Sequence, residues 1–424
     1  MFLDSKNYES LKRDMFNDIS LLTFIPLDIE TTGLNCWFHK PLLLIIKGDK
    51  QTWVLDLRTI PKKQISSLLK YIGTEKTIVG HNLKFDCKFL TYHYNVKFKS
   101  VFCTYVNSRL IWNGIKSKKY SLKYLTEFYI GEILDKEVRN SFINKPDDSP
   151  FTEEEIVYAE GDVKYLLDIK LKIEECLVKY NMEFLSELEN KFLLCLVQME
   201  LEGVKIDHEK WTKNIQDWEA ERLNMISNLD KELFNLSKKF KALSYASFDV
   251  KVDEDRLKVT QKNLFFDDTI IDIEKKARIN WSSPTQIKQI AYYCQIFLDS
   301  TGEDALLEYN KKNIGNPLEH LFELLVGDGN KVKGLRQIEK LLSTYGETFF
   351  KIENSITGKI HTSFSQVNTE TGRLSSGDTK SDGKKMNWGV NLQNIPADNK
   401  IRNCFIPDEG YLFCSSDLSG KNKN

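Results

Sequence analysis

Four short apolar runs in the first eighty residues constrain the fold of this chain more than any other feature of its sequence. Each run is rich in β-branched or other large apolar residues and is bounded by turn-forming or charged residues, which is typical of a buried strand. One helical pattern opens at Pro61, before the fourth run, and another follows that run from Leu83. Strands that come first and then alternate with helices predict an α/β domain with a mixed sheet flanked by helices. The runs lie at residues 22–30, 42–47, 52–57 and 77–80.

Helical periodicity dominates the middle of the chain. It extends over residues 153–201 with a break near Asn181, and over 209–240 without an internal Gly or Pro. It returns after Pro284 and over 334–356, and the sequence then changes to short strands and loops rich in Thr, Ser, Asn and Gly. We therefore expect three domains, at residues 1–185, 186–356 and 357–424.

The composition excludes several classes of protein. Purely apolar runs such as residues 42–46 are far shorter than the ~20 residues of a membrane-spanning helix, and the N-terminus lacks the pattern of a signal peptide. The eight cysteines show no CxxC and no metal-like spacing, so we expect a reduced, cytoplasmic protein. Lys and Arg number 60 against 61 Asp and Glu, so binding to nucleic acid would require local segregation of charge.

Three local patterns of polar residues stand out in the first half of the chain. Asp28 and Glu30 end the first apolar run, and side chains at i and i+2 of a strand share one face. Asp86 follows the fourth run, where a predicted strand gives way to a helix. Tyr158 and Asp162 lie one turn apart on one face of a predicted helix.

Clustered carboxylates of this kind suit the hydrolysis of a phosphodiester with two divalent cations. Two hard cations ~3.5–4 Å apart activate the attacking water and stabilise the leaving oxygen, and Mg²⁺ prefers oxygen ligands. Four acids would repel one another without metal, so we expect the site to form fully only with Mg²⁺ or Mn²⁺. A tyrosine beside the cluster can orient the attacking water.

Each pattern also has a plain structural interpretation. An Asp-x-Glu after a strand is common in helix caps and solvated turns, the pattern around Asp86 can be only a polar helix start, and Tyr-x-x-x-Asp alone is nearly uninformative. The occurrence of all three, in this order, within a predicted α/β domain favours the catalytic interpretation.

With these motifs, the first ~185 residues resemble the DEDD superfamily of 3′–5′ exonucleases, in its tyrosine subclass. The resemblance implies an RNase H-like fold. It also implies that Asp28, Glu30, Asp86 and Asp162 bind two divalent cations and that Tyr158 orients the water. A basic cluster between the second and third motifs could meet phosphates, but a solvated lysine face is the favoured interpretation. The cluster consists of Lys116, Lys118, Lys119 and Lys123.

Motifs in the second half decide between substrates, because the same five residues also occur in ribonucleases of the RNase D type. The motifs are Thr-Gly-Arg-Leu-Ser-Ser at 371–376, Asn-Leu-Gln-Asn-Ile-Pro at 391–396, Ile-Arg-Asn-Cys-Phe-Ile at 401–406 and Ser-Ser-Asp-Leu-Ser at 415–419. In this order they resemble family A (DNA polymerase I-like) DNA polymerases, from the thumb into the palm.

The resemblance and the side-chain chemistry together give a set of expected DNA contacts. Arg side chains can contact phosphates or minor-groove acceptors, and Asn and Gln amides can meet base edges or sugars. The predicted helix over 334–356 suits contacts of a polymerase thumb with the DNA backbone. Without the neighbouring motifs, a solvated helix face over an apolar core would be the preferred interpretation of this helix. The expected contacts are Asn82, Lys340, Ser343, Thr344, Tyr345, His361, Arg373, Gln393, Asn394 and Arg402.

The chain departs from the polymerase pattern in three places. Residues 377–390 resemble an exposed insertion between two motifs that are usually adjacent, and no 5′-nuclease domain precedes the exonuclease, as in phage-type members. Asp417 matches the first palm aspartate, a metal ligand, but the finger helix and the second palm aspartate do not follow it. The Asp253-Glu254 pair lies on the wrong side of this motif to replace the second aspartate. We therefore expect an incomplete palm with an open strand at 411–417, and no primer extension by this chain alone.

Three functions remain in competition on the sequence. The leading one is a proofreading 3′–5′ exonuclease acting on single-stranded and primer-template DNA, on part of a family A polymerase of a phage. The second is an RNase D-like exoribonuclease, which the 371–376 motif disfavours. The third is a non-catalytic half of a split polymerase, working with a second chain that supplies the fingers and the rest of the palm. A split gene, an intron and a truncated reading frame all remain open as reasons for the ending.

Overall fold

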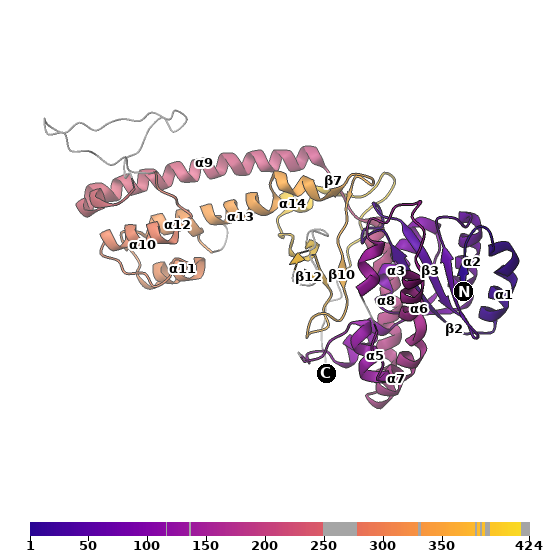
Figure 1. The fold of residues 1–424 in the computed structure, drawn as a ribbon. Coiled ribbons are helices and arrows are strands. Elements are labelled where there is room, and N and C mark those ends of the chain that lie inside the picture. Colours follow the sequence, from indigo (N-terminus) through magenta and orange to yellow (C-terminus); the bar gives the residue numbers. More distant parts are fainter. Residues whose placement is uncertain are drawn as a thin grey trace. The chain divides into compact units, whose positions relative to one another are not determined.

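The protein divides into two compact units in its computed structural model (Figure 1). The structure describes residues 1–115, 117–134, 137–248, 278–329, 332–377, 380–381, 384–385 and 391–416. Among these residues, no helix combines the length and the apolar character that crossing a bilayer requires. The first unit contains Met1–Lys205, Asn354–Pro396 and Pro407–Asn424, and the second contains Ile206–Glu353 and Ala397–Ile406.

The first unit is built on a six-stranded sheet in the order β1-β4-β3-β2-β5-β6. Strand β3 is antiparallel to both of its neighbours, whereas the outer pairings are parallel, so the predicted mixed sheet is confirmed. The four predicted strands correspond to β2, β3, β4 and β5, with ends that agree within two residues. The strands are β1 (Phe2–Leu3), β2 (Phe24–Thr31), β3 (Pro41–Lys47), β4 (Thr52–Asp56), β5 (Thr77–Gly80) and β6 (Ser100–Cys103).

Strand β3 shows why one predicted strand is a continuous apolar run rather than an alternating one. Leu44 and Ile46 face one hydrophobic core, and Leu43 and Ile45 face another on the opposite side of the sheet. All four side chains are fully buried. A strand covered on both faces has no solvent side, so polar residues have no place in it.

Helices cover both faces of this sheet. The core on one face includes residues of α1, α2, α3 and α8, and the core on the other includes residues of α5, α6 and α7. The predicted break near Asn181 separates α7 from α8, and this residue has a positive φ of 55°. The helices are α1 (Tyr8–Ser20), α2 (Lys62–Glu75), α3 (Lys84–Tyr94), α4 (Thr104–Ile111), α5 (Leu122–Ile130), α6 (Glu153–Lys164), α7 (Leu166–Lys179) and α8 (Glu183–Glu202).

The second unit is helical, and the long helix α9 supplies one wall of its core. Leu229, Leu233 and Leu236 form a stripe on α9 that packs with residues of α10 and α12. Asp207 caps the start of α9, since its carboxylate accepts a hydrogen bond from the Lys210 N–H at 3.0 Å. The helices are α9 (His208–Lys239), α10 (Pro284–Tyr293), α11 (Glu303–Lys312), α12 (Glu319–Val326), α13 (Leu335–Tyr345) and α14 (Asn399–Arg402).

The helix predicted over 334–356 is shorter than expected, because α13 ends at Tyr345. The Gly346 N–H still bonds to the Leu342 carbonyl at 3.0 Å, but a Cβ at position 346 would lie 2.2 Å from that oxygen. Only glycine fits there, and the chain leaves the helix for the 3₁₀ turn Glu347–Ile352.

The C-terminal part of the chain contains only short elements. The segment from β9 (Lys359–Ile360) to β11 (Ser375–Ser376) belongs to the first unit. The open strand expected at 411–417 stays a prediction, and its residues 411–416 are irregular in the structure. Asp417 and the Asp253-Glu254 pair lie outside the described residues, as does most of the expected insertion at 377–390.

Candidate active site

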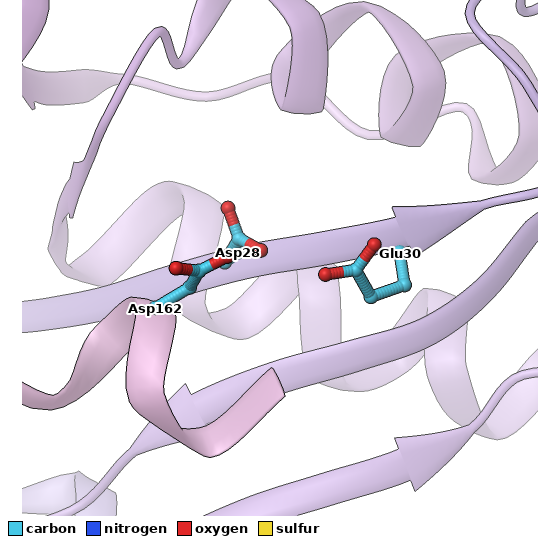
Figure 2. Close-up of side chains that lie close together, drawn as sticks. All are labelled: Asp28, Glu30 and Asp162. Carbon is cyan, nitrogen blue, oxygen red and sulfur yellow. The ribbon is translucent and has the colours of Figure 1, made fainter. Parts of the chain in front are cut away.

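Three carboxylates meet at the end of strand β2. Asp28 and Glu30 project from β2 and Asp162 from α6, and each offers an oxygen within 4.8 Å of the other two (Figure 2). The alternation of side chains along a strand puts Asp28 and Glu30 on one face, and α6 packs on that face through Ala159 and Val163. The site therefore combines two residues of β2 with a third that lies more than 130 positions later in the chain.

The surroundings of these carboxylates favour a cation. Glu30 is 8% and Asp162 9% exposed, so little water screens the repulsion between the negative groups. Three oxygens at this spacing match the hard ligands that Mg²⁺ and Mn²⁺ prefer. The residues present therefore fit a divalent cation.

Asp86 lies beside this set but is not a member of it. Its Oδ1 accepts a hydrogen bond at 3.1 Å from the backbone N–H of Ile29, the residue between Asp28 and Glu30. Burial raises the pKa of Asp86 to about 7, against its backbone hydrogen bonds, and the negative charge of Asp162 adds to the rise. The carboxyl group is thus next to the site and holds a proton more readily than an ordinary aspartate.

Asp86 reaches this position because strand β5 turns sharply into α3. A Cβ at Gly80 would lie 2.4 Å from the Leu83 side chain, so the turn needs glycine there. Asn82 is exposed, has a φ of 60°, and its carbonyl accepts the Phe85 N–H at 3.0 Å. Asn82, an expected DNA contact, therefore lies in the turn that leads to Asp86.

Tyr158 lies on α6, one turn before Asp162, and is 8% exposed. The start of α6 is fixed by a capping box between Thr152 and Glu155. Burial raises the pKa of Glu155, but hydrogen bonds from Ser141 and Thr152 and the charge of Lys145 lower it more, so the net shift is downward. This anchored first turn holds the helix that carries both Tyr158 and Asp162.

The expected DNA contacts fall in both units. In the first unit Arg373, Gln393 and Asn394 are exposed, and the Gln393 amide donates to the Leu374 carbonyl at 2.9 Å. In the second unit Arg402 is exposed on α14. The exposed thumb-like residues on α13 are Lys340, Ser343 and Thr344.

Two expected contacts have packing roles in the structure. Tyr345 is 6% exposed, with its ring 6.3 Å from Trp211. His361 is 8% exposed; its Nδ1 lies 2.8 Å from the Glu200 carbonyl oxygen and its Nε2 lies 2.7 Å from Thr357 Oγ1. Tertiary packing thus covers two side chains that the motifs alone would leave open to DNA.

Only part of the basic cluster is exposed to solvent among the residues that the structure describes. Lys118 lies over the rings of Phe128 at 4.0 Å and Trp112 at 4.7 Å, whereas Lys119 and Lys123 are exposed. Lys116 lies outside the described residues.

Sequence reasoning missed an ionic network behind the site. Glu200 on α8 pairs with Lys84 and Lys88, which flank Asp86 on α3. The spacing of the two lysines places them on one face of a helix, but nothing in the sequence indicates that an acid more than a hundred residues away meets them.

Comparison with known families matches two segments of the chain. Residues 7–177 match the family described as 3′–5′ exonuclease, and residues 252–421 match DNA polymerase family A. The first segment contains all five expected exonuclease residues, and the second contains the expected polymerase motifs.

Individual relatives agree with these matches. The chain is 25% identical over 414 residues to a DNA polymerase I of Aquifex aeolicus, covering 93% of this chain and 58% of the relative. It is 24% identical over 422 residues to a DNA polymerase I of Borreliella burgdorferi, covering 96% and 39%. The chain thus spans less than two thirds of the length of these relatives.

A solved structure shows a similar fold. The polymerase domain of Pol1 from M. smegmatis, in complex with a DNA primer-template and dNTP, matches with a TM-score of 0.61 and 17% identity. The match covers 94% of this chain and 58% of that one.

Proposed function

Because the chain is DNA polymerase I-like, with a 3′–5′ exonuclease segment followed by a segment of DNA polymerase family A, we propose that its acidic site removes nucleotides from the 3′ end of DNA. The observation that carries this proposal is the set of three carboxylate oxygens within 4.8 Å, with Asp86 bonded to the strand between two of them. A proofreading role follows from the polymerase segment in the same chain.

The residues have distinct roles in this proposal. Asp28, Glu30 and Asp162 would hold divalent cations, whose chemistry would be to activate a water molecule and stabilise the leaving oxygen. The ionised carboxylate of Asp86 would add a further negative charge beside such cations. Tyr158, one turn from Asp162, orients the attacking water through its hydroxyl.

We also propose that the chain binds primer-template DNA. The match of residues 252–421 to DNA polymerase family A supports this, and so does the M. smegmatis structure, which contains such DNA. The exposed side chains of Arg373, Gln393 and Arg402 are the contacts that we propose first.

The purified protein should release mononucleotides from the 3′ end of labelled single-stranded DNA in the presence of Mg²⁺ or Mn²⁺. A paired 3′ end should react more slowly, because its terminal base must first leave the duplex. Gel analysis of 5′-labelled and 3′-labelled strands gives the direction of digestion. Activity that persists in EDTA, or that begins at the 5′ end, would contradict the proposal, and faster digestion of RNA than of DNA would favour an exoribonuclease.

Replacing Tyr158 by Phe should lower the rate of nucleotide release about 10- to 100-fold, since the water loses one orienting hydrogen bond. Metal affinity should change little, because the carboxylates remain. Titration calorimetry with Mn²⁺ and single-turnover kinetics separate the two effects. Tyr165→Phe, just beyond the same helix, is the matched control and should leave both unchanged. Loss of metal binding in Tyr158→Phe would show that its role is misassigned.

A further inference from the structure

A partly buried ionic network connects helix α3, which carries Asp86, to residues 361–364, just before the first polymerase motif. We propose that Glu200 is a positioning residue for the metal site: it fixes α3, and with it Asp86, against residues 361–364. This inference rests on the proposed exonuclease function. It adds that residues 361–364, far along the chain from the exonuclease segment, are a working part of the exonuclease.

The network binds helix α3 on the side opposite the metal site. Glu200 is 2% exposed, and its two oxygens lie 2.5 Å from Lys84 Nζ and 3.0 Å from Lys88 Nζ. Asp86 is two residues from each lysine, and at 100° per residue it projects from the other side of α3, toward Ile29. A rotation or shift of α3 that breaks the contacts with Glu200 therefore also displaces Asp86.

The same carboxylate holds the polymerase-like segment. Glu200 Oε1 accepts the Phe364 N–H at 2.8 Å, and Lys84 Nζ donates to the Phe364 carbonyl and to Ser363 Oγ, the latter at 3.2 Å. The backbone of Phe364 is thus bonded through both its N–H and its carbonyl to the network that flanks Asp86. Burial raises the pKa of Glu200, but Lys88, Lys84 and the Phe364 N–H lower it more, so the net shift favours the charged form.

The loop that follows the metal-binding strand joins the same network. Trp37, between β2 and β3, lies 4.1 Å from the His361 ring, and Lys88 Nζ lies 4.7 Å from the Trp37 ring. Gly203 permits this approach, because a Cβ there would lie 2.6 Å from His361 ring atoms. Residues 361–364 therefore contact both the loop after Glu30 and the helix of Asp86.

Variants of the full chain separate positioning from simple support of the fold. Glu200→Gln leaves two partly buried lysines without their acid. The triple variant Lys84→Met, Lys88→Met, Glu200→Leu instead removes all three charges together. Replacing a whole buried ionic network by apolar side chains commonly preserves stability, whereas breaking half of one does not. Glu187→Gln on the same helix removes an exposed ion pair with Lys191 and is the matched control.

We expect Mn²⁺ binding, followed by electron paramagnetic resonance, to weaken about 10- to 100-fold in Glu200→Gln. In nuclease assays kcat at low metal should fall by a similar factor and recover as metal is raised, while KM for single-stranded DNA changes less than threefold. The triple variant should regain the melting temperature of the unmodified protein but not its metal affinity, because the bonds to Phe364 are still missing. Glu187→Gln should match the unmodified protein in every measurement.

Two results would overturn the inference. One is unaltered Mn²⁺ affinity in a folded Glu200→Gln protein, and the other is a triple variant that regains both stability and metal affinity. If Glu200→Gln does not fold, the triple variant decides alone. An unmodified protein without nuclease activity would refute the proposed function, while the Mn²⁺ measurements would still test the positioning role.

Discussion

Replacing Asp28 and Glu30 together by alanine should lower the rate of 3′-terminal nucleotide release by at least about 1000-fold. The pair supplies two of the three oxygens that lie within 4.8 Å of one another, so Asp162 alone cannot hold a cation in the position that hydrolysis requires. Single-turnover digestion of labelled single-stranded DNA, with Mg²⁺ in excess, measures the loss. Melting curves should show that the variant is folded.

A neighbouring acid provides the control for this prediction. Glu160 lies on α6, two residues from Asp162, and pairs with the N-terminal amine at 3.0 Å instead of joining the site. Glu160→Gln should therefore keep the rate within a factor of two. Equal losses in both proteins would mean that general negative charge, and not the three-carboxylate set, supports the reaction.

Metal should stabilise the protein far more at pH 8 than at pH 5.5. The pKa of Asp86 is raised to about 7 in the folded protein, above the value near 3.9 of an unfolded aspartate. The folded state therefore binds a proton that the unfolded state releases. This contribution is complete below about pH 4 and is lost as the pH rises from there through about 7. A bound cation reverses the loss, because it favours the ionised carboxylate.

Thermal unfolding in EDTA and in Mg²⁺ at the two pH values tests this prediction, with Asp86→Asn as the reference. The difference between the two proteins isolates Asp86 from other titrating groups. In EDTA the substituted protein should lose less stability between pH 5.5 and pH 8. Parallel pH dependences in the two proteins would contradict a raised pKa at Asp86.

Local patterns carried most of the information about the sheet. Apolar runs, their lengths and the turns between them predicted β2 to β5, and side-chain alternation along β2 explains why Asp28 and Glu30 share a face. The two-residue strand β1 and strand β6 were not predicted, because such short elements depend on the neighbours with which they pair.

Long-range packing accounts for what the sequence could not reveal. The motifs mark His361 and Tyr345 as DNA contacts, but nothing local shows that Trp37 and Trp211 lie beside their rings. Likewise, α13 ends at Tyr345, and the conformation of Gly346 beyond it leaves no room for a side chain beside the Leu342 carbonyl. Each case depends on atoms that only the folded chain brings together.

The first unit is assembled from separate stretches of chain, with most of the second unit encoded between them. During translation, a ribosome that has completed Lys205 must still add more than 150 residues before Phe364 can reach Glu200. At about 5–20 residues per second, this interval lasts on the order of ten to thirty seconds. Throughout that time the nascent first unit lacks the hydrogen bonds that residues 363 and 364 make with Lys84 and Glu200. A ribosome-bound chain arrested before this segment would therefore expose Glu200, Lys84 and Lys88 to water and to chaperones.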